Sequence, residues 1–219
     1  MADFDARRRS LVVSLERGGY IRDPTVRRAF LVVPREEFVP VDLRGDAYAD
    51  TPLPIGAGQT ISAPSMIALM FEVAHLAAGQ QVLDVGTGSG YNAALLAAIA
   101  GPRNVVSVER LPELATFGRD NLRRTGFGEV EVSVADGTLG YPPRAPYDCI
   151  MATAGAPRIP RPWMDQTRAG GRIVAPIGRS TFTQVLTVAT LGPGGKWEVR
   201  EDTPCAFVPL VGAEGWREE

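Results

Sequence analysis

The stretch Val82-Leu-Asp-Val-Gly-Thr-Gly-Ser-Gly-Tyr91 decides the fold of this chain. Its apolar beginning runs into Asp84 and then breaks into three alternating glycines, before a helix-forming stretch over 92–100. Glycine tolerates positive φ and lets the backbone approach a ligand closely, and open α/β sheets bind ligands at the carboxyl ends of their strands. A strand, a tight loop and a helix in this order therefore predict a ligand site at the edge of an α/β sheet.

The spacing of the glycines indicates which cofactor this loop binds. Gly86, Gly88 and Gly90 form a G-x-G-x-G pattern, whereas the dinucleotide fingerprint needs its third glycine one residue later, where this chain has Tyr91. No Lys-Ser or Lys-Thr pair follows, so the loop lacks the signature of a phosphate-binding P-loop. The pattern favours an S-adenosylmethionine site over an NAD or ATP site.

Acidic residues stand at the ends of three successive expected strands. Glu109 closes the run 104–109, about 20 residues past the glycines, where related folds place a carboxylate on ribose hydroxyls. Asp136 follows the run 130–135 and could accept a hydrogen bond from an adenine amino group, although in isolation an ordinary Asp-Gly turn is the better explanation. The three acids together favour a cofactor site. The predicted cofactor-binding residues are Asp84, Gly86, Gly88, Gly90, Glu109, Asp136 and Gly137.

Length and composition predict a single domain over 1–219. The 219 residues, 45% of them hydrophobic, suffice for one sizeable core. We expect residues 1–60 to form a helical and lid segment, and residues 61–219 to form the core with a C-terminal substrate-binding segment. No apolar run approaches the ~18 residues that span a bilayer, and the charged N-terminus lacks a signal-peptide pattern, which predicts a cytoplasmic protein without a membrane partner. The net charge of −2 argues against a nucleic-acid partner, and we expect a monomer.

The scarcity of histidine and cysteine limits the kinds of metal site and catalytic group that this chain can form. His75 is the only histidine, and Cys149 and Cys205 are the only cysteines, with no C-x-x-C pattern. This inventory predicts no metal site and no Ser-His-Asp triad, and we expect both cysteines to be buried thiols.

Periodicity and turn residues outline the order of the elements. Helices are expected over 3–17, 24–32, 64–77, 92–100, 112–125 and 162–167. Strands are expected from 82, and over 104–109, 130–135, 147–153 and 172–176, followed by a hairpin of 183–191 and 196–201. The glycine pair at 170–171 is expected to be a turn, and 34–58 a long loop that serves as a lid. This order predicts a Rossmann-like, doubly wound sheet with antiparallel edge strands and an N-terminal helical and loop lid, the α/β fold of class I S-adenosylmethionine-dependent methyltransferases.

The segment Gln59-Thr-Ile-Ser-Ala-Pro64 precedes the helix expected from Pro64. Ser62 is placed to be the N-cap of that helix. A hydroxyl and free backbone N–H groups at a helix N-terminus would also suit a carboxylate ligand. The two roles are compatible, and the residues alone leave both open.

Five motifs together resemble the protein-L-isoaspartate O-methyltransferase family, in particular its archaeal-type members. They are Gln59-Thr-Ile-Ser-Ala-Pro64, Val82 to Tyr91, Asp136-Gly137, Ala145-Pro-Tyr-Asp148 and Phe207-Val-Pro-Leu210. The resemblance implies methyl transfer from S-adenosylmethionine to the α-carboxylate of L-isoaspartyl residues in damaged proteins and peptides. The methyl ester then collapses to a succinimide, whose hydrolysis returns some normal aspartate.

The resemblance also implies roles for particular residues. Ser62 matches the active-site serine, and the Gly86–Gly90 loop, Glu109 and Asp136 match cofactor contacts. With Thr60, whose hydroxyl stands just before the expected helix, the predicted substrate-binding residues are Thr60, Ser62, Ser65, Val208 and Leu210. Many members have His or Tyr where this chain has Ser65, a departure that concerns the shape of the inner substrate pocket.

Three alternative functions are considered. A relative of the same family could methylate an aspartate in a ribosomally made peptide to form an aspartimide. A nucleic-acid amino methyltransferase usually carries an Asn/Asp-Pro-Pro-Tyr turn after its fourth strand, where this chain reads Ala154-Gly-Ala-Pro157. A binding protein with a relic cofactor fold would be favoured by a broken glycine loop or a missing acid at 109, and this chain keeps both features.

Overall fold

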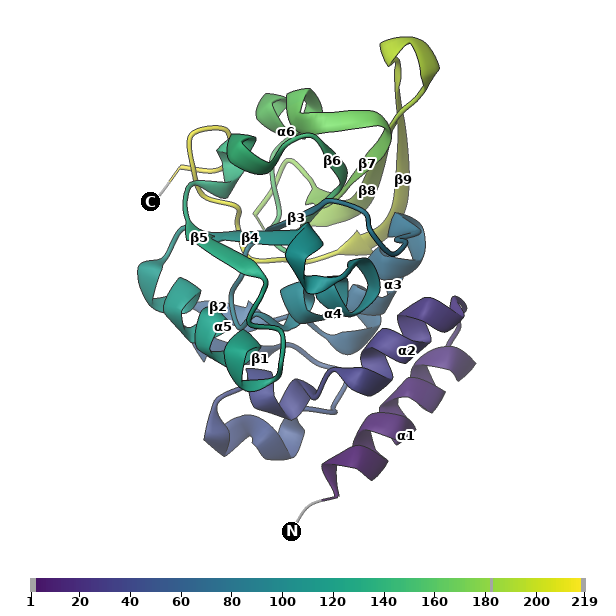
Figure 1. Cartoon of the computed structure of the whole chain (residues 1–219), viewed down its shortest axis with the longest axis vertical. Coiled ribbons are helices and arrows are strands. Elements are labelled where there is room, and N and C mark those ends of the chain that lie inside the picture. The colour runs from purple at the N-terminus through teal and green to yellow at the C-terminus, as the bar shows by residue number, and fades with distance from the viewer. Residues whose placement is uncertain (1–2, 182, 218–219) are drawn as a thin grey trace.

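The computed structural model describes residues 3–181 and 183–217, and Figure 1 shows the arrangement of its elements. The α-helices are α1 (Phe4–Arg17), α2 (Pro24–Val32), α3 (Pro64–Ala74), α4 (Tyr91–Ala100), α5 (Pro112–Arg124) and α6 (Arg161–Gln166). The strands are β1 (Leu53–Gly56), β2 (Gln59–Ile61), β3 (Val82–Val85), β4 (Val105–Glu109), β5 (Glu131–Val134), β6 (Tyr147–Ala152), β7 (Thr167–Ile177), β8 (Gln184–Leu191) and β9 (Trp197–Cys205). Among the described residues no helix is long and apolar enough to cross a membrane.

The main sheet has seven strands in the order β5-β4-β3-β6-β7-β8-β9. The pairs from β5 to β7 are parallel, and the pairs β7–β8 and β8–β9 are antiparallel. This topology confirms the predicted doubly wound sheet with an antiparallel edge. β3 lies between β4 and β6, so the chain order reverses at its carboxyl end, which is where open α/β sheets bind ligands.

Successive residues of the central strands pack on opposite faces of the sheet, as the two-residue period of a strand requires. Val82 of β3 belongs to the core beneath α3 and α4, whereas Leu83 belongs to the core that includes Trp163 of α6. Both faces are thus covered by helices (Figure 1), and every residue of β3 and β4 is buried. The apolar runs read from the sequence correspond to these doubly covered strands.

The segment expected to be one long irregular loop contains regular structure. Short 3₁₀ helices span Arg35–Phe38 and Val41–Asp46, and β1 and β2 form an antiparallel hairpin. Short apolar pieces between prolines concealed these elements from a reading of composition. The division expected between 60 and 61 falls inside β2, and the assignment of the first segment as a lid stays a prediction.

Three expected boundaries were wrong by three residues or more. α3 ends at Ala74, three residues early, because His75 takes a left-handed conformation with φ 46°. β7 begins at Thr167 and runs through the glycine pair at 170–171, which was expected to be a turn. Gly171 is needed for close approach, since a Cβ there would lie 2.9 Å from the Tyr147 carbonyl oxygen. β9 extends to Cys205, four residues beyond its expected end, because it pairs with β8 over that length.

Candidate active site

The glycine loop after β3 owes its shape to three left-handed residues. Gly86, Gly88 and Gly90 have φ of 98°, 50° and 87°, a region that favours glycine. A Cβ at Gly90 would lie 2.8 Å from the Gly118 carbonyl oxygen, so the third glycine is also needed where α4 packs against α5. The alternating glycines of the sequence are therefore conformational requirements of this turn.

Glu109 at the end of β4 closes one side of the loop. Its Oε2 accepts a hydrogen bond of 2.9 Å from Gly88 N, and its Oε1 accepts one of 3.0 Å from Leu111 N. A carboxylate oxygen has two lone pairs, so each oxygen can still accept from a ligand. Glu109 and the glycine loop, each predicted from the sequence to bind the cofactor, thus lie in direct contact in the fold, and their contact with a cofactor stays a prediction.

Asp84 lies behind the loop, within the protein. Its carboxylate is fully buried and accepts hydrogen bonds from Asn92 Nδ2 at 2.7 Å and Ser107 Oγ at 2.6 Å. Burial raises the pKa of Asp84 to about 7, against the lowering effect of these two donors. Asp84 does not line the cavities described below. Its placement supports the loop from behind, and a direct cofactor contact stays a prediction.

Asp136 holds the C-terminal segment in place. Its Oδ1 accepts from Thr138 N at 2.9 Å and from Thr138 Oγ1 at 2.6 Å, and its Oδ2 accepts from Ala213 N at 2.9 Å. Gly137 does line a cavity, and a Cβ there would lie 2.6 Å from Val85 Cγ1. The Asp-Gly pair therefore joins the carboxyl edge of the sheet to residues near the end of the chain.

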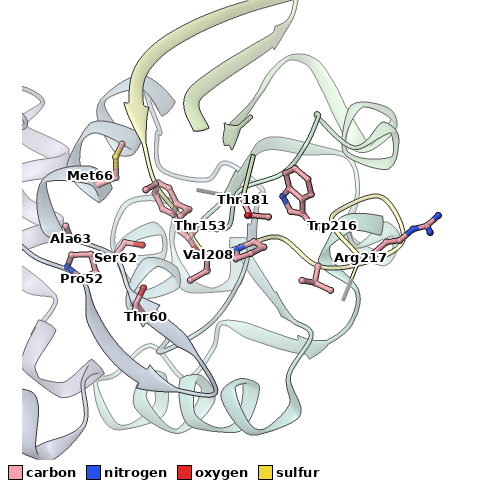
Figure 2. Close-up of a pocket in the computed structure, with 14 residues that line it drawn as sticks. Pro52, Thr60, Ser62, Ala63, Met66, Thr153, Thr181, Val208, Trp216 and Arg217 are labelled. Atoms are coloured by element: carbon pink, nitrogen blue, oxygen red, sulfur yellow. The ribbon is translucent and has the colours of Figure 1, made fainter. Parts of the chain in front are cut away.

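Three neighbouring cavities open at the carboxyl edge of the sheet. The largest, of about 870 Å³, extends from Ser62 to Trp216 and is drawn in Figure 2. The second, of about 210 Å³, is lined by Gly86, Glu109 and Gly137, and the third, of about 30 Å³, lies between the glycine loop and the Ser62 segment. We call them the outer, the adenosine-side and the inner cavity, and the second takes its name from the cofactor group that the sequence predicts beside Glu109.

Two threonines, Thr60 and Thr153, line all three cavities. Thr60 was predicted from the sequence as a substrate-binding residue, but Thr153 was missed. Its position directly after β6 is the available signal, because β6 neighbours β3 and its carboxyl end must therefore reach the same site.

Ser62 lines both the outer and the inner cavity. The N-cap of α3 is Ala63, and within the described residues it has no side-chain cap, so the interpretation of Ser62 as the N-cap is wrong. Within residues 3–181 and 183–217 no hydrogen bond involves Ser62 Oγ. The hydroxyl, drawn in Figure 2, is therefore available to a ligand.

Arg35 supports the Ser62 segment from within the protein. Its side chain is fully buried, and it donates 2.8 Å hydrogen bonds to the Ser62 and Ala47 carbonyl oxygens. The guanidinium lies 4.8 Å from the ring centroid of Tyr91, the first residue of α4. Within the described chain it makes no ion pair and its Nη1 has no partner, and burial lowers its pKa below the ordinary value. Sequence reasoning missed Arg35, since nothing in its neighbourhood distinguishes it from a surface arginine.

The remaining predicted substrate residues are placed differently from one another. Val208 lines the outer and adenosine-side cavities, and Leu210 lines the latter. Their main-chain groups already bond to Gly155, through Gly155 N to Val208 O and Leu210 N to Gly155 O, each at 2.8 Å. Ser65 lines none of the three cavities described here, and its N–H donates to Asp50 Oδ1 at 2.8 Å.

Cationic and metal-binding groups are sparse at this site. Arg217, at the outer end of the outer cavity, is the charged residue among those that line it. In residues 3–181 and 183–217 no group of three or more His, Cys, Asp or Glu side chains could hold a metal ion. The arrangement thus offers hydroxyls, backbone groups and the Glu109 carboxylate, with Arg110 and Arg217 among the lining residues and Arg35 buried behind Ser62.

Comparisons with known proteins identify the family. The family model described as protein-L-isoaspartate(D-aspartate) O-methyltransferase matches residues 6–215. A protein-L-isoaspartate O-methyltransferase from Hyperthermus butylicus is 54% identical over 98% of this chain and 92% of its own length, and one from Methanopyrus kandleri is 50% identical over 98% and 96%.

Solved structures agree in fold over nearly the whole chain. A protein-L-isoaspartate O-methyltransferase from Plasmodium falciparum, in complex with S-adenosyl-L-homocysteine, superposes with a TM-score of 0.82 at 28% identity, over 92% of this chain and 97% of the other. Another structure of that name has a TM-score of 0.83 at 31% identity, over 95% of this chain and 67% of the other. The chain therefore belongs to the protein-L-isoaspartate(D-aspartate) O-methyltransferase family.

Proposed function

We propose that the residues around the three cavities have separate roles in the reaction of an S-adenosylmethionine-dependent protein carboxyl methyltransferase. The enzyme transfers a methyl group from S-adenosylmethionine to the α-carboxylate of L-isoaspartyl residues in damaged proteins and peptides. The family relationship carries this activity. The assignment of individual residues is our proposal, and it depends on where they lie around the cavities.

The adenosine-side and inner cavities fit the cofactor. A Cβ at Gly86 would lie 3.0 Å from Thr153 Oγ1, and one at Gly88 would lie 3.2 Å from Ile55 Cδ1, so side chains there would fill the narrow space beside the loop. Glu109 would accept from the ribose hydroxyls, and Gly137 would let the adenine approach the sheet edge. When bound, the cofactor supplies a methyl group on a cationic sulfur, which the carboxylate oxygen displaces to give a methyl ester and a neutral thioether.

The substrate chemistry explains the absence of an acid–base cluster from the proposed site residues. A carboxyl group with a pKa near 4 is already ionised at pH 7, so methylation of its oxygen needs no general base. It needs the oxygen to be aligned with the methyl group and water to be removed from the site, which is catalysis by positioning. We assign this positioning to Ser62, whose hydroxyl would donate to one carboxylate oxygen and leave the other directed toward the methyl group.

The observation that carries this proposal is that Ser62 lines both the outer cavity and the inner cavity beside the glycine loop. A substrate carboxylate at Ser62 would thus lie between the peptide and the cofactor. The outer cavity extends from there to Trp216 over largely apolar side chains and the Val208 segment, a shape that suits an extended peptide. Because Val208 O and Leu210 N already bond to Gly155, side-chain contacts rather than those two main-chain groups would hold the peptide.

The deciding experiment is methyl transfer from labelled S-adenosylmethionine to two peptides that differ only in an L-isoaspartyl or a normal L-aspartyl residue. Transfer to the isoaspartyl peptide alone is expected. Preferred transfer to the aspartyl twin, whose methyl ester then closes to an aspartimide with loss of methanol, would instead support the peptide-aspartate alternative. A monomeric state and a cytoplasmic location stay predictions, and gel filtration with light scattering would measure the first.

A further inference from the structure

Thr153 is placed where the three cavities meet. Together with Thr60 it lines the outer, adenosine-side and inner cavities, and Figure 2 labels Thr60 beside Ser62 and Thr153 beside Val208. If the cofactor spans the adenosine-side and inner cavities and the substrate carboxylate occupies the outer cavity, the transferred methyl group must lie at this junction. This inference therefore rests on the proposed function.

The hydrogen of the Thr153 hydroxyl is already in use. Thr153 Oγ1 donates to the Gly86 carbonyl oxygen at 3.1 Å, while Thr153 N donates to the Val85 carbonyl oxygen at 3.0 Å. These two bonds clamp the side chain against the first corner of the glycine loop. No other hydrogen bond in the described residues involves this hydroxyl, so its lone pairs are left for the junction.

An oxygen that presents only lone pairs attracts a cation and repels an anion. The sulfonium group of S-adenosylmethionine is cationic, and its methyl hydrogens are polarised donors of weak C–H···O hydrogen bonds. The isoaspartyl carboxylate is anionic, so such an oxygen would repel it. Ser62 is complementary in this respect, because its Oγ makes no hydrogen bond within the described chain and can donate to the carboxylate.

We propose that Thr153 is a further catalytic residue, whose Oγ accepts C–H hydrogen bonds from the sulfonium methyl group while its own hydrogen is held by Gly86. It would orient the methyl group toward the carboxylate held at Ser62. It would also favour the charged methyl donor over the neutral demethylated product, which helps the product leave. Glu109 cannot substitute for it, since Glu109 lines the adenosine-side cavity alone.

The test compares affinities for S-adenosylmethionine and S-adenosylhomocysteine, which differ by the methyl group and the charge. Calorimetry without peptide gives both dissociation constants for the wild type, Thr153→Val and Thr153→Ser. Valine keeps the shape and loses the oxygen, whereas serine keeps the oxygen. We expect Thr153→Val to weaken S-adenosylmethionine binding by about 2- to 5-fold, from the loss of a weak hydrogen bond, with a change below about 2-fold for S-adenosylhomocysteine. Thr153→Ser should retain the wild-type ratio of the two constants.

Three results would overturn the proposal. Equal weakening of both ligands would mean that Thr153 only shapes the Gly86 corner. An unchanged ratio with a raised peptide KM would place the hydroxyl on the substrate carboxylate, and an unchanged ratio with normal kinetics would remove Thr153 from the mechanism. Because the affinities are measured without peptide, they are independent of which carboxylate is methylated, and the isoaspartyl assay of the wild type tests the proposed function separately. Thermal melts of each variant identify any loss of folding.

Discussion

The Arg35 guanidinium donates a 2.8 Å hydrogen bond to the carbonyl oxygen of Ser62, from a side chain that is fully buried. A buried cation is normally paired with an acid, but this one makes no ion pair within the described residues and instead bonds to two carbonyl oxygens. It joins the N-terminal segment to the loop that carries the proposed substrate serine. It also lies over Tyr91 at the beginning of the helix that follows the glycine loop.

This relationship predicts that Arg35 acts on catalysis through Ser62. Arg35→Met should leave the Ser62 and Ala47 carbonyl oxygens unsatisfied, at about 1–3 kcal/mol each, and lower kcat/KM roughly 10-fold or more as the Ser62 loop loosens. Arg35→Lys keeps the charge and should recover part of the loss. In the Ser62→Ala background the same change should cost much less activity, since the positioned hydroxyl is already gone.

Steady-state kinetics on an isoaspartyl peptide, with thermal melts, would measure this cycle. Arg27→Met is the matched control, because Arg27 makes an exposed ion pair with Glu16 on the surface. Fully additive effects of the changes at 35 and 62 would show that Arg35 stabilises the fold without acting through Ser62.

Ser62→Ala should separate catalysis from stability. The lost hydrogen bond to a charged oxygen is worth ~1.5–3 kcal/mol, so kcat/KM should fall roughly 10-fold or more. Because Ala63 rather than Ser62 is the N-cap of α3, the free energy of unfolding should change by less than about 0.5 kcal/mol. Kinetics and denaturant unfolding, beside Ser14→Ala on the exposed face of α1 as control, measure both quantities. A variant with normal kcat/KM and lowered stability would return Ser62 to a structural role.

Glu109→Ala should weaken cofactor binding. The change removes the acceptor proposed for the ribose hydroxyls and also frees Gly88 N, so the affinity for S-adenosylmethionine should fall by roughly 1.5–3 kcal/mol. Calorimetry is the measurement, and Glu113→Ala on the exposed side of α5 is the control. Unchanged affinity in the Glu109 variant would remove this residue from the cofactor site.

The buried carboxyl group of Asp84 should make the free energy of unfolding depend on pH. Burial raises its folded-state pKa to about 7, above the unfolded value near 3.9, so the unfolded chain ionises first as the pH rises. Its contribution to stability is therefore fully present below about pH 4 and is lost as the pH rises to about 7. Asp84→Asn removes this loss, so the variant should gain stability relative to the wild type between these pH values. Urea unfolding at a series of pH values, with the exposed Asp120→Asn as control, measures the difference, and parallel curves would contradict the raised pKa.

We expect Trp216 to contribute to peptide binding without affecting the affinity for the cofactor. Its ring lines the outer cavity alone, and its Nε1 donates to the Gly155 carbonyl oxygen at 3.0 Å. Trp216→Phe loses that bond, worth about 1 kcal/mol, and should raise the peptide KM several-fold with unchanged affinity for S-adenosylmethionine. Trp197→Phe, on β9, is the matched control. A fall in cofactor affinity at Trp216 would contradict the division between the cavities.

The local pattern of the sequence determined the sheet and the loop that precedes α4. Positive φ at Gly86, Gly88 and Gly90 is a local requirement, and a run of β-branched residues favours a strand. The hairpin of β8 and β9 was likewise predicted from its Gly-Pro-Gly-Gly connection, although the end of β9 was not, because pairing with β8 decides it. Local signals thus account for the fold class and for the position of the cofactor loop.

Only the tertiary structure decided which side chains meet at the site. Ser62 satisfies the local rule for an N-cap, yet the helix begins after Ala63, and the hydroxyl is left for a ligand. Arg35 lies 27 residues before Ser62, and Thr153 lies 67 residues after Gly86, with no local pattern that links either pair. Such contacts depend on the order of strands in the sheet and on how the N-terminal segment packs against it. The physical reason is that hydrogen bonds and burial act over a few ångströms in space, whereas the patterns read from a sequence extend only a few residues along the chain.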